Sequence, residues 1–243
     1  PYDVRISGET EVNAHNIERI EANCQGKTTI RFVTMGDSQR WYDETEDFVK
    51  EINKRNDIDF VIHGGDMSDF GLTKEFLWQR DIMNGLNVPY VVLIGNHDCL
   101  GTGAETYKAV FGPTNFSFIA GNVKFVCLNT NALEYDYSEP VPNFTFMEQE
   151  ITSRLDEFEK TVISMHARPY TDVFNDNVAK VFQHYIRQYP GIQVCTAAHT
   201  HHYQDDVIFD DGIHYVTSDC MDYRTYLVFT ITPEKYEYEL VKY

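Results

Sequence analysis

Three apolar runs of the sequence each end in glycine followed by a side chain that can bind a metal ion. These side chains are Asp37, Asp66 and Asn96, and His97 comes directly after the third. Glycine lets the backbone turn sharply where a strand stops, and in α/β proteins ligands collect at the carboxyl ends of strands. We therefore expect the three positions to converge on one centre.

Two later apolar runs end in histidine, one at His166 and the other at His199 and His201. Carboxylates, an amide oxygen and imidazoles form a mixed oxygen and nitrogen donor set, which suits zinc, manganese or iron rather than calcium. Taken singly, each residue would as readily form a turn or cap a helix, so the prediction depends on the whole set.

The five motifs together resemble those of the calcineurin-like metallophosphoesterase family. That family's pattern is Asp-x-His, Gly-Asp-x-x-Asp, Gly-Asn-His-Asp/Glu, a single His and Gly-His-x-His. The matching segments here are Asp37-Ser38-Gln39, Gly65-Asp66-Met67-Ser68-Asp69, Gly95-Asn96-His97-Asp98, His166 and Ala198-His199-Thr200-His201. They stand in the family's order, and independent turn residues have no reason to do so.

The resemblance implies a site with two divalent or trivalent metal ions: manganese, zinc, iron or a mixture. By this resemblance Asp66 bridges both ions. One ion is held further by Asp37, Gln39 and His201, and the other by Asn96, His166 and His199. A hydroxide shared between the ions would attack phosphorus in line, so the implied activity is hydrolysis of a small phosphomonoester or phosphodiester.

Several neighbouring residues are expected to assist this chemistry. By the resemblance, His97 is the general acid for the leaving oxygen, and we expect Asp98 to favour its protonated form. Asp69 is expected to support its loop rather than bind metal. We expect Asn96 and Arg168 to contact the substrate phosphate, although Arg168 is equally compatible with a surface arginine.

Two positions depart from the family pattern. Gln39 stands where the family usually has histidine, and a neutral amide oxygen is a poorer ligand than imidazole for zinc-like ions. Ala198 replaces a glycine but removes no ligand. The first departure leaves an alternative open: a non-catalytic, metal-stabilised interaction domain with the phosphoesterase fold.

The chain must fold so that these loops meet, and its periodicity indicates how. From about residue 29, short β-branched runs alternate with helix-like stretches, which is typical of strands joined by crossover helices. The predicted strands are 29–35, 58–63, 88–94, a pair within 115–129, 161–165 and 192–197, and the predicted helices are 44–54, 73–83, 146–158 and 176–189. The last forty residues predict consecutive antiparallel strands.

The expected fold class is α/β, and the resemblance implies a four-layer α/β/β/α sandwich of two mixed sheets flanked by helices. No Gly-, Ser- or Pro-rich linker divides the chain, so we expect a single domain over residues 1–243. Residues 1–28 are an N-terminal extension in which 13–22 fit a short helix, with no assigned role.

The charge of the chain argues against some classes of substrate. Thirty-eight acidic against twenty basic side chains give a formal net charge of −18, which repels long nucleic acids and argues against a nuclease of the same chemistry.

No apolar run is long enough to span a membrane. The sequence determines neither oligomeric state nor localisation. An exported or envelope-associated location is expected if a signal peptide was removed before Pro1.

Overall fold

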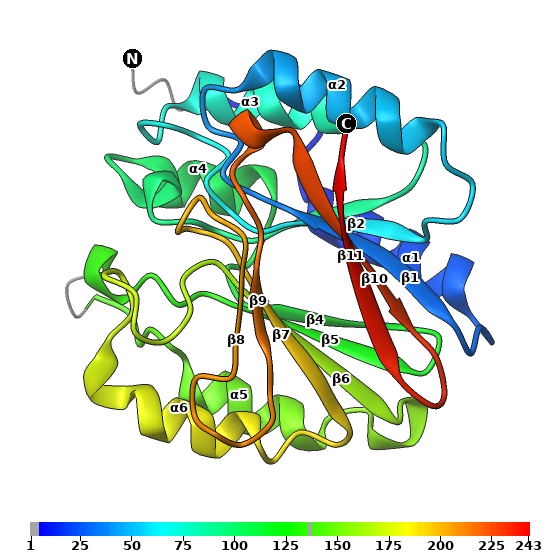
Figure 1. The fold of residues 1–243 in the computed structure, drawn as a ribbon. Coiled ribbons are helices and arrows are strands. Elements are labelled where there is room, and N and C mark those ends of the chain that lie inside the picture. The colour runs from blue at the N-terminus through cyan, green and yellow to red at the C-terminus, as the bar shows by residue number, and fades with distance from the viewer. Residues whose placement is uncertain (1–4, 136–137) are drawn as a thin grey trace.

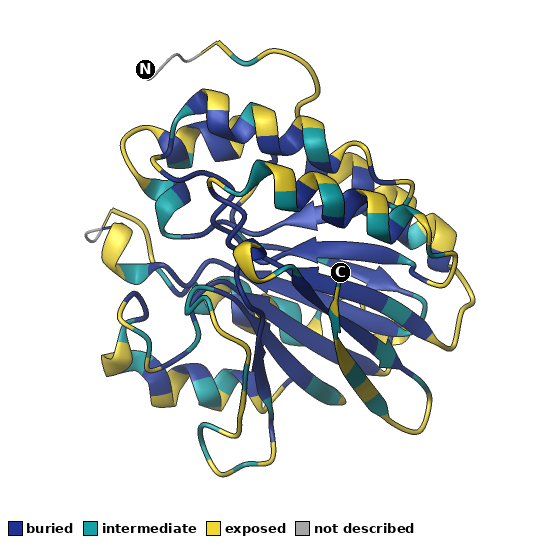
Figure 2. Ribbon diagram, turned by 45° about the horizontal axis from the view of Figure 1, so that its top comes forward, coloured by how far each residue is buried: buried dark blue, intermediate teal, exposed yellow. Residues whose placement is uncertain are grey.

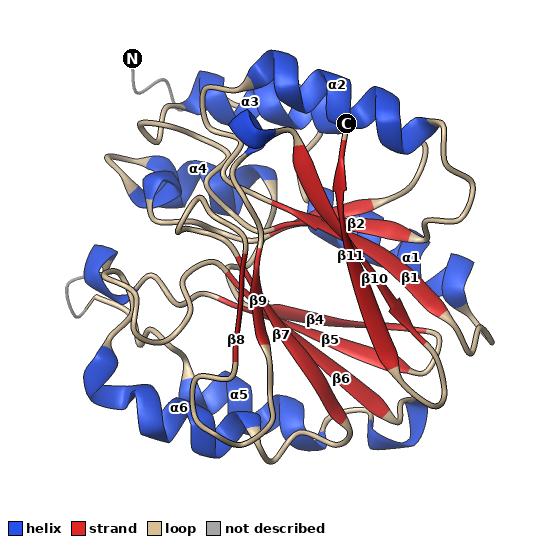
Figure 3. Cartoon of the chain, viewed as in Figure 1, coloured by secondary structure: helices blue, strands red, loops and turns tan. Residues whose placement is uncertain are grey.

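Two β-sheets lie face to face, and helices cover the outer side of each (Figures 1 and 3). The structure is a computed structural model that describes residues 5–135 and 138–243. Its layers run helix, sheet, sheet, helix, which confirms the predicted α/β/β/α architecture of two mixed sheets. Within the described residues, no helix is long and apolar enough to cross a membrane.

The first sheet has the strand order β11-β10-β1-β2-β3. Its strands are β1 (Ile30–Met35), β2 (Phe60–His63), β3 (Tyr90–Val92), β10 (Thr225–Ile231) and β11 (Tyr236–Lys242). Strands β1, β2 and β3 are parallel, as crossover helices require, whereas β10 pairs antiparallel with β1. The three parallel strands therefore deliver their following loops to one edge.

The second sheet has the order β4-β5-β6-β7-β9-β8. Its strands are β4 (Phe116–Ala120), β5 (Val123–Leu128), β6 (Lys160–Met165), β7 (Ile192–Ala197), β8 (Gln204–Asp206) and β9 (Tyr215–Thr217). Strands β5, β6, β7 and β9 are parallel, and the two edge strands run antiparallel to them.

Aromatic side chains fill the space between the sheets. Phe32 and Phe60 each meet Phe125 of the opposite sheet edge to face, with ring centroids 4.9 and 5.1 Å apart. Such contacts add to the stabilisation from burial. Figure 2 shows the resulting pattern, in which the inner strands are buried, the edge strand β11 is partly exposed, and the helices are exposed on their outer faces.

The helices divide between the outer layers. The helices over the first sheet are α2 (Tyr42–Asn53), α3 (Thr73–Met83) and α4 (Gly103–Val110), and those over the second are α5 (Phe144–Thr152) and α6 (Ala179–Ile186). Short 3₁₀ turns are η1 (His97–Cys99), η2 (Ala132–Glu134), η3 (Leu155–Glu157), η4 (Asp176–Val178) and η5 (Met221–Tyr223). Each amphipathic helix buries its apolar side against a sheet.

The N-terminal helix α1 (Val12–Cys24) packs against both cores. Its Asn13 side chain pairs with edge strand β3 like an added strand, donating to the carbonyl of Val92 and accepting from its N–H, both at 2.9 Å. An unpaired edge strand invites association with another chain, and Asn13 satisfies two of its backbone groups. The segment to which the sequence assigned no role thus closes one edge of the first sheet.

One topological expectation is wrong in part. Strand β8 pairs antiparallel with β9, and β10 with β11, as expected. Strands β9 and β10 are not neighbours, because β9 joins the second sheet beside β7 and β10 crosses to the first sheet beside β1. Between them, Cys220 forms an isolated parallel bridge with Gly36, the residue that follows β1. Alternating side chains identify a strand but do not specify its partner.

Candidate metal centre

The candidate residues lie on loops that follow β1, β2, β3, β6 and β7, and these loops gather at one end of the sandwich (Figure 1). The first candidate of each loop comes one to four residues after its strand ends. Since so little chain separates ligand from sheet, the hydrogen-bonded strands fix where each side chain begins. The first three strands belong to one sheet and the last two to the other.

Backbone strain is concentrated in these loops. The candidates with left-handed backbone are Asp37 (φ 50°), Gln39 (φ 30°), Asp66 (φ 58°), His199 (φ 73°) and His201 (φ 62°). For a residue with a Cβ this conformation costs roughly 1–2 kcal/mol, and such residues cluster at functional sites. The fold therefore tolerates strain where the sequence predicts the ligands.

Two glycines of the motifs are required by close approach. A Cβ on Gly95 would lie 2.1 Å from Oδ1 of Asp66, and one on Gly65 would lie 2.7 Å from Nδ1 of His166. Gly65 also has φ of 103°. The backbone thus touches the candidate ligands, and only glycine leaves room for them.

Three buried side chains lie in the middle of the candidate centre. Asp37, Asp66 and His166 each offer a ligand atom, and these atoms lie within 4.8 Å of one another. Oδ1 of Asp37 is buried and has no hydrogen-bond partner. A buried carboxylate oxygen without a donor is costly, and a cation would satisfy it. The donor set and this unpaired oxygen fit a metal ion.

A second group of donors converges on the amide oxygen of Asn96. Its Oδ1 lies 3.0 Å from Nε2 of His166 and 2.9 Å from Nδ1 of His199. Nε2 of His166 is also 3.4 Å from Oδ2 of Asp66. Ligand atoms about 3 Å apart are the expected edges of a coordination sphere with bonds of about 2.1 Å. This group matches the metal set predicted for Asn96, His166 and His199.

The first predicted set is less complete. Nε2 of His201 lies 3.5 Å from Oδ1 of Asp37, which places this imidazole at the unpaired oxygen. Gln39 presents its amide nitrogen to the centre, since Nε2 donates to Oδ2 of Asp66 at 3.2 Å. To act as a ligand, the Gln39 side chain must turn its oxygen inward instead. The departure noted in the sequence is thus the weakest element of the centre.

His97 stands beside this centre, partly exposed. Its backbone N–H donates to Oδ1 of Asp66 at 2.9 Å, and its Nδ1 lies 2.8 Å from the carbonyl oxygen of Asp69. The Asp69 carboxylate is bound by Arg40 at 2.6 Å. Asp69 therefore holds the ring of His97, whose side chain remains 35% exposed.

The structure differs from the sequence expectation for Asp98. We expected this carboxylate to act on His97, but it is fully buried and accepts backbone N–H groups instead. Its donors are Asp66 at 2.8 Å, Ser68 at 2.8 Å and Gly95 at 2.9 Å. Asp98 thus joins the loops after β2 and β3. Adjacent residues in a tight turn point in different directions, so sequence neighbours need not be in contact.

Arg168, predicted to contact phosphate, is held by a polar and an acidic partner at the two ends of β8. Its guanidinium donates to Oε1 of Gln204 and to Oδ2 of Asp206, both at 2.8 Å. A substrate would have to compete with these bonds. The substrate-binding role of Arg168, like that of Asn96, therefore stays a prediction.

Two further residues support the centre and were not assigned to it from the sequence. Nε2 of His199 lies 2.7 Å from Oδ1 of Asp172. His63 is buried between two motif loops, where its Nε2 lies 2.8 Å from Oγ of Ser38 and its Nδ1 accepts from the N–H of Gly65 at 3.2 Å. Burial lowers the pKa of His63 to about 3, so this ring is neutral and structural.

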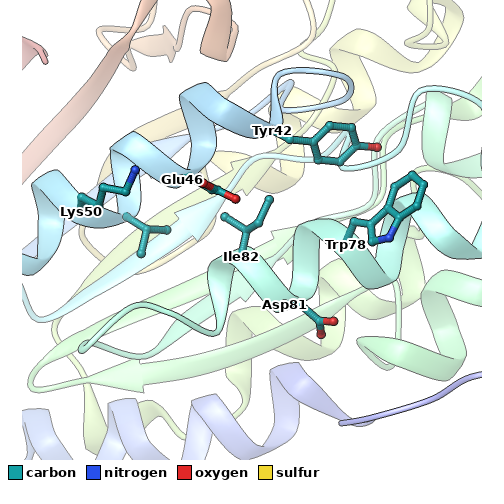
Figure 4. A pocket seen from close by; sticks show the side chains of 7 residues that line it. Tyr42, Glu46, Lys50, Trp78, Asp81 and Ile82 are labelled. Carbon is teal, nitrogen blue, oxygen red and sulfur yellow. The ribbon is translucent and has the colours of Figure 1, made fainter.

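A groove outside the centre runs between α2 and α3 (Figure 4). It is lined by Tyr42, Glu46, Val49, Lys50, Trp78, Asp81 and Ile82. The rings of Tyr42 and Trp78 meet edge to face with centroids 5.8 Å apart. None of these residues is a candidate ligand, so the chemistry lies at the loops and not in this groove.

Burial and neighbouring charges shift the pKa values of the candidate ligands. Burial acts to lower the pKa of His166, but the charge of Asp66 and the hydrogen bond to it raise that pKa to about 9. Burial acts to raise the pKa of Asp66, while the charge of His166 brings it below the usual range. Burial and the charge of His166 both lower the pKa of His199. Without metal, the centre therefore holds a proton on His166 at neutral pH.

Loading the metal-free protein at about pH 7 should release about one proton per chain. His166 is protonated below a pH of about 9, and a ligating imidazole must be neutral, so metal competes with that proton. Affinity should rise with pH toward 9, by up to about tenfold per pH unit. Isothermal titration in buffers of different ionisation enthalpy counts the protons released. Metal uptake with no proton release would contradict this charge distribution.

The sequence profile of the calcineurin-like phosphoesterases matches residues 30–203. The chain belongs to the calcineurin-like phosphoesterase family. Together with the buried Asp37, Asp66 and His166, membership supports a metal-dependent hydrolase of phosphate esters. Among curated proteins, none matches this chain.

Solved structures share the fold at low sequence identity. A dimetal phosphatase from Danio rerio has a TM-score of 0.67 at 12% identity, over 89% of this chain and 98% of that one. The yellow lupin purple acid phosphatase PPD1 has a TM-score of 0.65 at 14% identity, over 90% and 52%. GAP50, the anchor in the inner membrane complex of Plasmodium, has a TM-score of 0.67 at 11% identity, over 89% and 85%.

Proposed function

We propose that this protein hydrolyses a small phosphomonoester or phosphodiester with two metal ions that share Asp66. The observation that carries the proposal is the convergence of two donor sets on this one carboxylate. Oδ2 of Asp66 lies 3.2 Å from the amide of Gln39 and 3.4 Å from His166. Asp37 and His201 complete one set, and Asn96 and His199 complete the other.

The residues divide the work as follows. When bound, two metal ions would activate water as a nucleophile and neutralise phosphate oxygens. Asp66 and Asp37 supply the negative charge that attracts the ions. His97 holds a proton at the exposed edge of the centre for the leaving oxygen, and the carbonyl of Asp69 fixes its ring at 2.8 Å. Asp98 keeps the loops of Asp66 and His97 in register.

A small substrate fits the charge of the chain. A formal net charge of −18 repels a polyanion along its length, whereas a single phosphate group can enter a site where bound cations offset the local charge. Long nucleic acid is therefore not the proposed substrate. Binding of DNA with a steep salt dependence would contradict this part of the proposal.

Esters that differ in leaving group test the function. Metal-free protein would be reloaded with manganese, zinc or iron and assayed on phosphomonoesters and phosphodiesters. His97→Ala should lower kcat/KM about 10²–10⁴-fold for alkyl esters and much less for nitrophenyl esters, whose leaving group departs without a proton. His15→Ala, on the exposed side of α1, is the matched control. Equal losses on both ester types would remove His97 from the acid role.

The alternative is a metal-stabilised interaction domain without catalysis. Gln39 supports it, because its amide nitrogen faces Asp66. The likeness in fold to GAP50, named as an anchor, supports it as well. His97 opposes it, since an interaction domain has no need of an exposed imidazole beside the centre. Fewer than two ions per chain at saturating metal, together with no hydrolysis across the ester panel, would favour this alternative.

Gln39→His should strengthen the weaker metal set. An imidazole replaces an amide whose nitrogen faces the centre, so zinc or manganese affinity at this set should rise about 10-fold or more. Calorimetric titration resolves the two affinities. Gln25→His, the same substitution at the exposed C-terminal end of α1, is the matched control. An unchanged weaker affinity would show that residue 39 does not limit this set.

A further inference from the structure

We propose that Asp172 is a positioning residue that directs His199 at the metal centre and makes the set of Asn96, His166 and His199 the first to fill. The inference rests on the proposed metal centre. It starts from one contact, in which Oδ1 of Asp172 lies 2.7 Å from Nε2 of His199. The other ring nitrogen, Nδ1, faces Oδ1 of Asn96 at 2.9 Å.

The tautomer of His199 follows from its partners. A neutral imidazole carries one N–H, and both oxygens that face the ring, Oδ1 of Asp172 and Oδ1 of Asn96, can only accept. The charged carboxylate is the stronger acceptor, so Asp172 holds the hydrogen on Nε2, and the lone pair of Nδ1 is left on the side where a cation would bind. Ligating histidines commonly donate their other N–H to a carboxylate or a carbonyl, which fixes the ring and raises its basicity.

His166 has the same arrangement with a different acceptor. Its Nδ1 lies 2.8 Å from the carbonyl oxygen of Gly64, and its Nε2 lies 3.0 Å from Oδ1 of Asn96. Both rings are therefore oriented from outside by an acceptor, and both direct their inner nitrogen at the same amide oxygen. The carbonyl of Gly64 orients the fully buried ring of His166, and Asp172 orients the ring of His199, which lies nearer to solvent.

The loop after β6 presents Asp172 with defined geometry. The next two residues, Val173 and Phe174, are buried in the core under the second sheet, whereas the Asp172 side chain is 86% exposed. On the other side, Thr171 donates to the carbonyl of Arg168 through both its N–H and its hydroxyl. An exposed aspartate is thus held between fixed neighbours and aimed at one imidazole.

The two metal sets are unequal for this reason. One set has both histidines oriented from outside, by Gly64 and Asp172. The other contains Gln39, whose amide nitrogen faces Asp66. Metal added in limiting amounts should therefore occupy the set of His199 first, and the chain should bind its two ions in sequence.

Calorimetric titration of the metal-free protein with manganese tests the inference. The wild type should show two affinities. Asp172→Ala should weaken the tighter one about 10–100-fold and leave the other within about twofold. Asp172→Asn keeps an acceptor oxygen without the charge, so its tighter affinity should lie between those of the wild type and Asp172→Ala. Asp172→Glu restores the charge and should recover part of the lost affinity. Asp176→Asn is the matched control, since this aspartate of the following turn accepts only from the N–H of Tyr170.

Nitrogen-15 NMR of the metal-free protein gives a second readout. His199 should carry its hydrogen on Nε2 in the wild type, and Asp172→Ala should populate the other tautomer. Unchanged affinities with an unchanged tautomer in Asp172→Ala would overturn the inference, and so would equal weakening of both ions. A wild type that binds two ions in sequence without cleaving any ester would refute the proposed hydrolysis and leave the role of Asp172 intact.

Discussion

Replacing Asp66 with asparagine should lower kcat/KM for phosphate esters by about a thousand-fold or more. The Asp66 carboxylate is the group that both donor sets share, with Oδ2 near Gln39 and His166 and Oδ1 accepting from the N–H of His97. Asparagine keeps the shape and one acceptor oxygen but loses the charge that, in the proposed function, would hold two cations close together. The loss should appear in kcat as well as in metal affinity.

The backbone of Asp66 makes the choice of substitution and control important. Its φ of 58° is left-handed, a conformation that asparagine tolerates as well as aspartate, so the variant should fold. Asp210→Asn is the matched control, because Asp210 is exposed and has a φ of 54°. Steady-state kinetics and elemental analysis measure turnover and bound metal. Activity of Asp66→Asn within tenfold of the wild type, with both ions bound, would end the proposal of a shared carboxylate.

Asp98→Ala should destabilise the fold by about 3–5 kcal/mol and abolish hydrolysis. The substitution leaves the N–H groups of Asp66, Ser68 and Gly95 buried without their acceptor, and each unsatisfied group costs roughly 1–3 kcal/mol. The loops after β2 and β3 would also lose their common tether. A shift of about 1 Å in a reacting group is enough to lower a rate about a hundredfold.

Urea denaturation measures the first effect and ester hydrolysis the second. Asp98→Asn should fall between the alanine variant and the wild type, since its amide keeps one acceptor oxygen but turns an NH₂ toward the remaining donors. Asp156→Ala, at an exposed position without left-handed backbone, should change stability by less than about 1 kcal/mol. A loss below about 1 kcal/mol in Asp98→Ala would show that water replaces the carboxylate and that the tether is dispensable.

The sequence predicts much of the candidate centre because the information is local. A glycine, a short strand before it and a ligand after it define each loop, and the structure brings Asp37, Asp66, Asn96, His166 and His199 together. Their roles as ligands remain predictions. The same local logic fails for Asp98, which is adjacent to His97 in sequence. Within the 3₁₀ turn η1 one side chain faces solvent and the other the interior.

The sequence likewise predicts some elements of the fold and misses others. Period-two and helical patterns predict most strands and helices, including α3 and β7 at their observed bounds. They do not predict the short helix α4 or the edge strand β8, which present little pattern over eight and three residues. They also cannot assign β9 to the second sheet, since any strand offers the same backbone groups to either neighbour.

The sequence by itself determined the family of the chain and the kinds of side chain that its loops present, because residue type and glycine spacing are properties of adjacent residues. Only the tertiary structure decided which groups orient those ligands. Asp172 and His199 are 27 residues apart, Asp98 and Asp66 are 32 apart, and Asn13 and Val92 are 79 apart. Each pair depends on a hydrogen bond between segments that come together only when β6 pairs with β7, when β2 pairs with β3, or when α1 packs against β3, and no local pattern records such a contact.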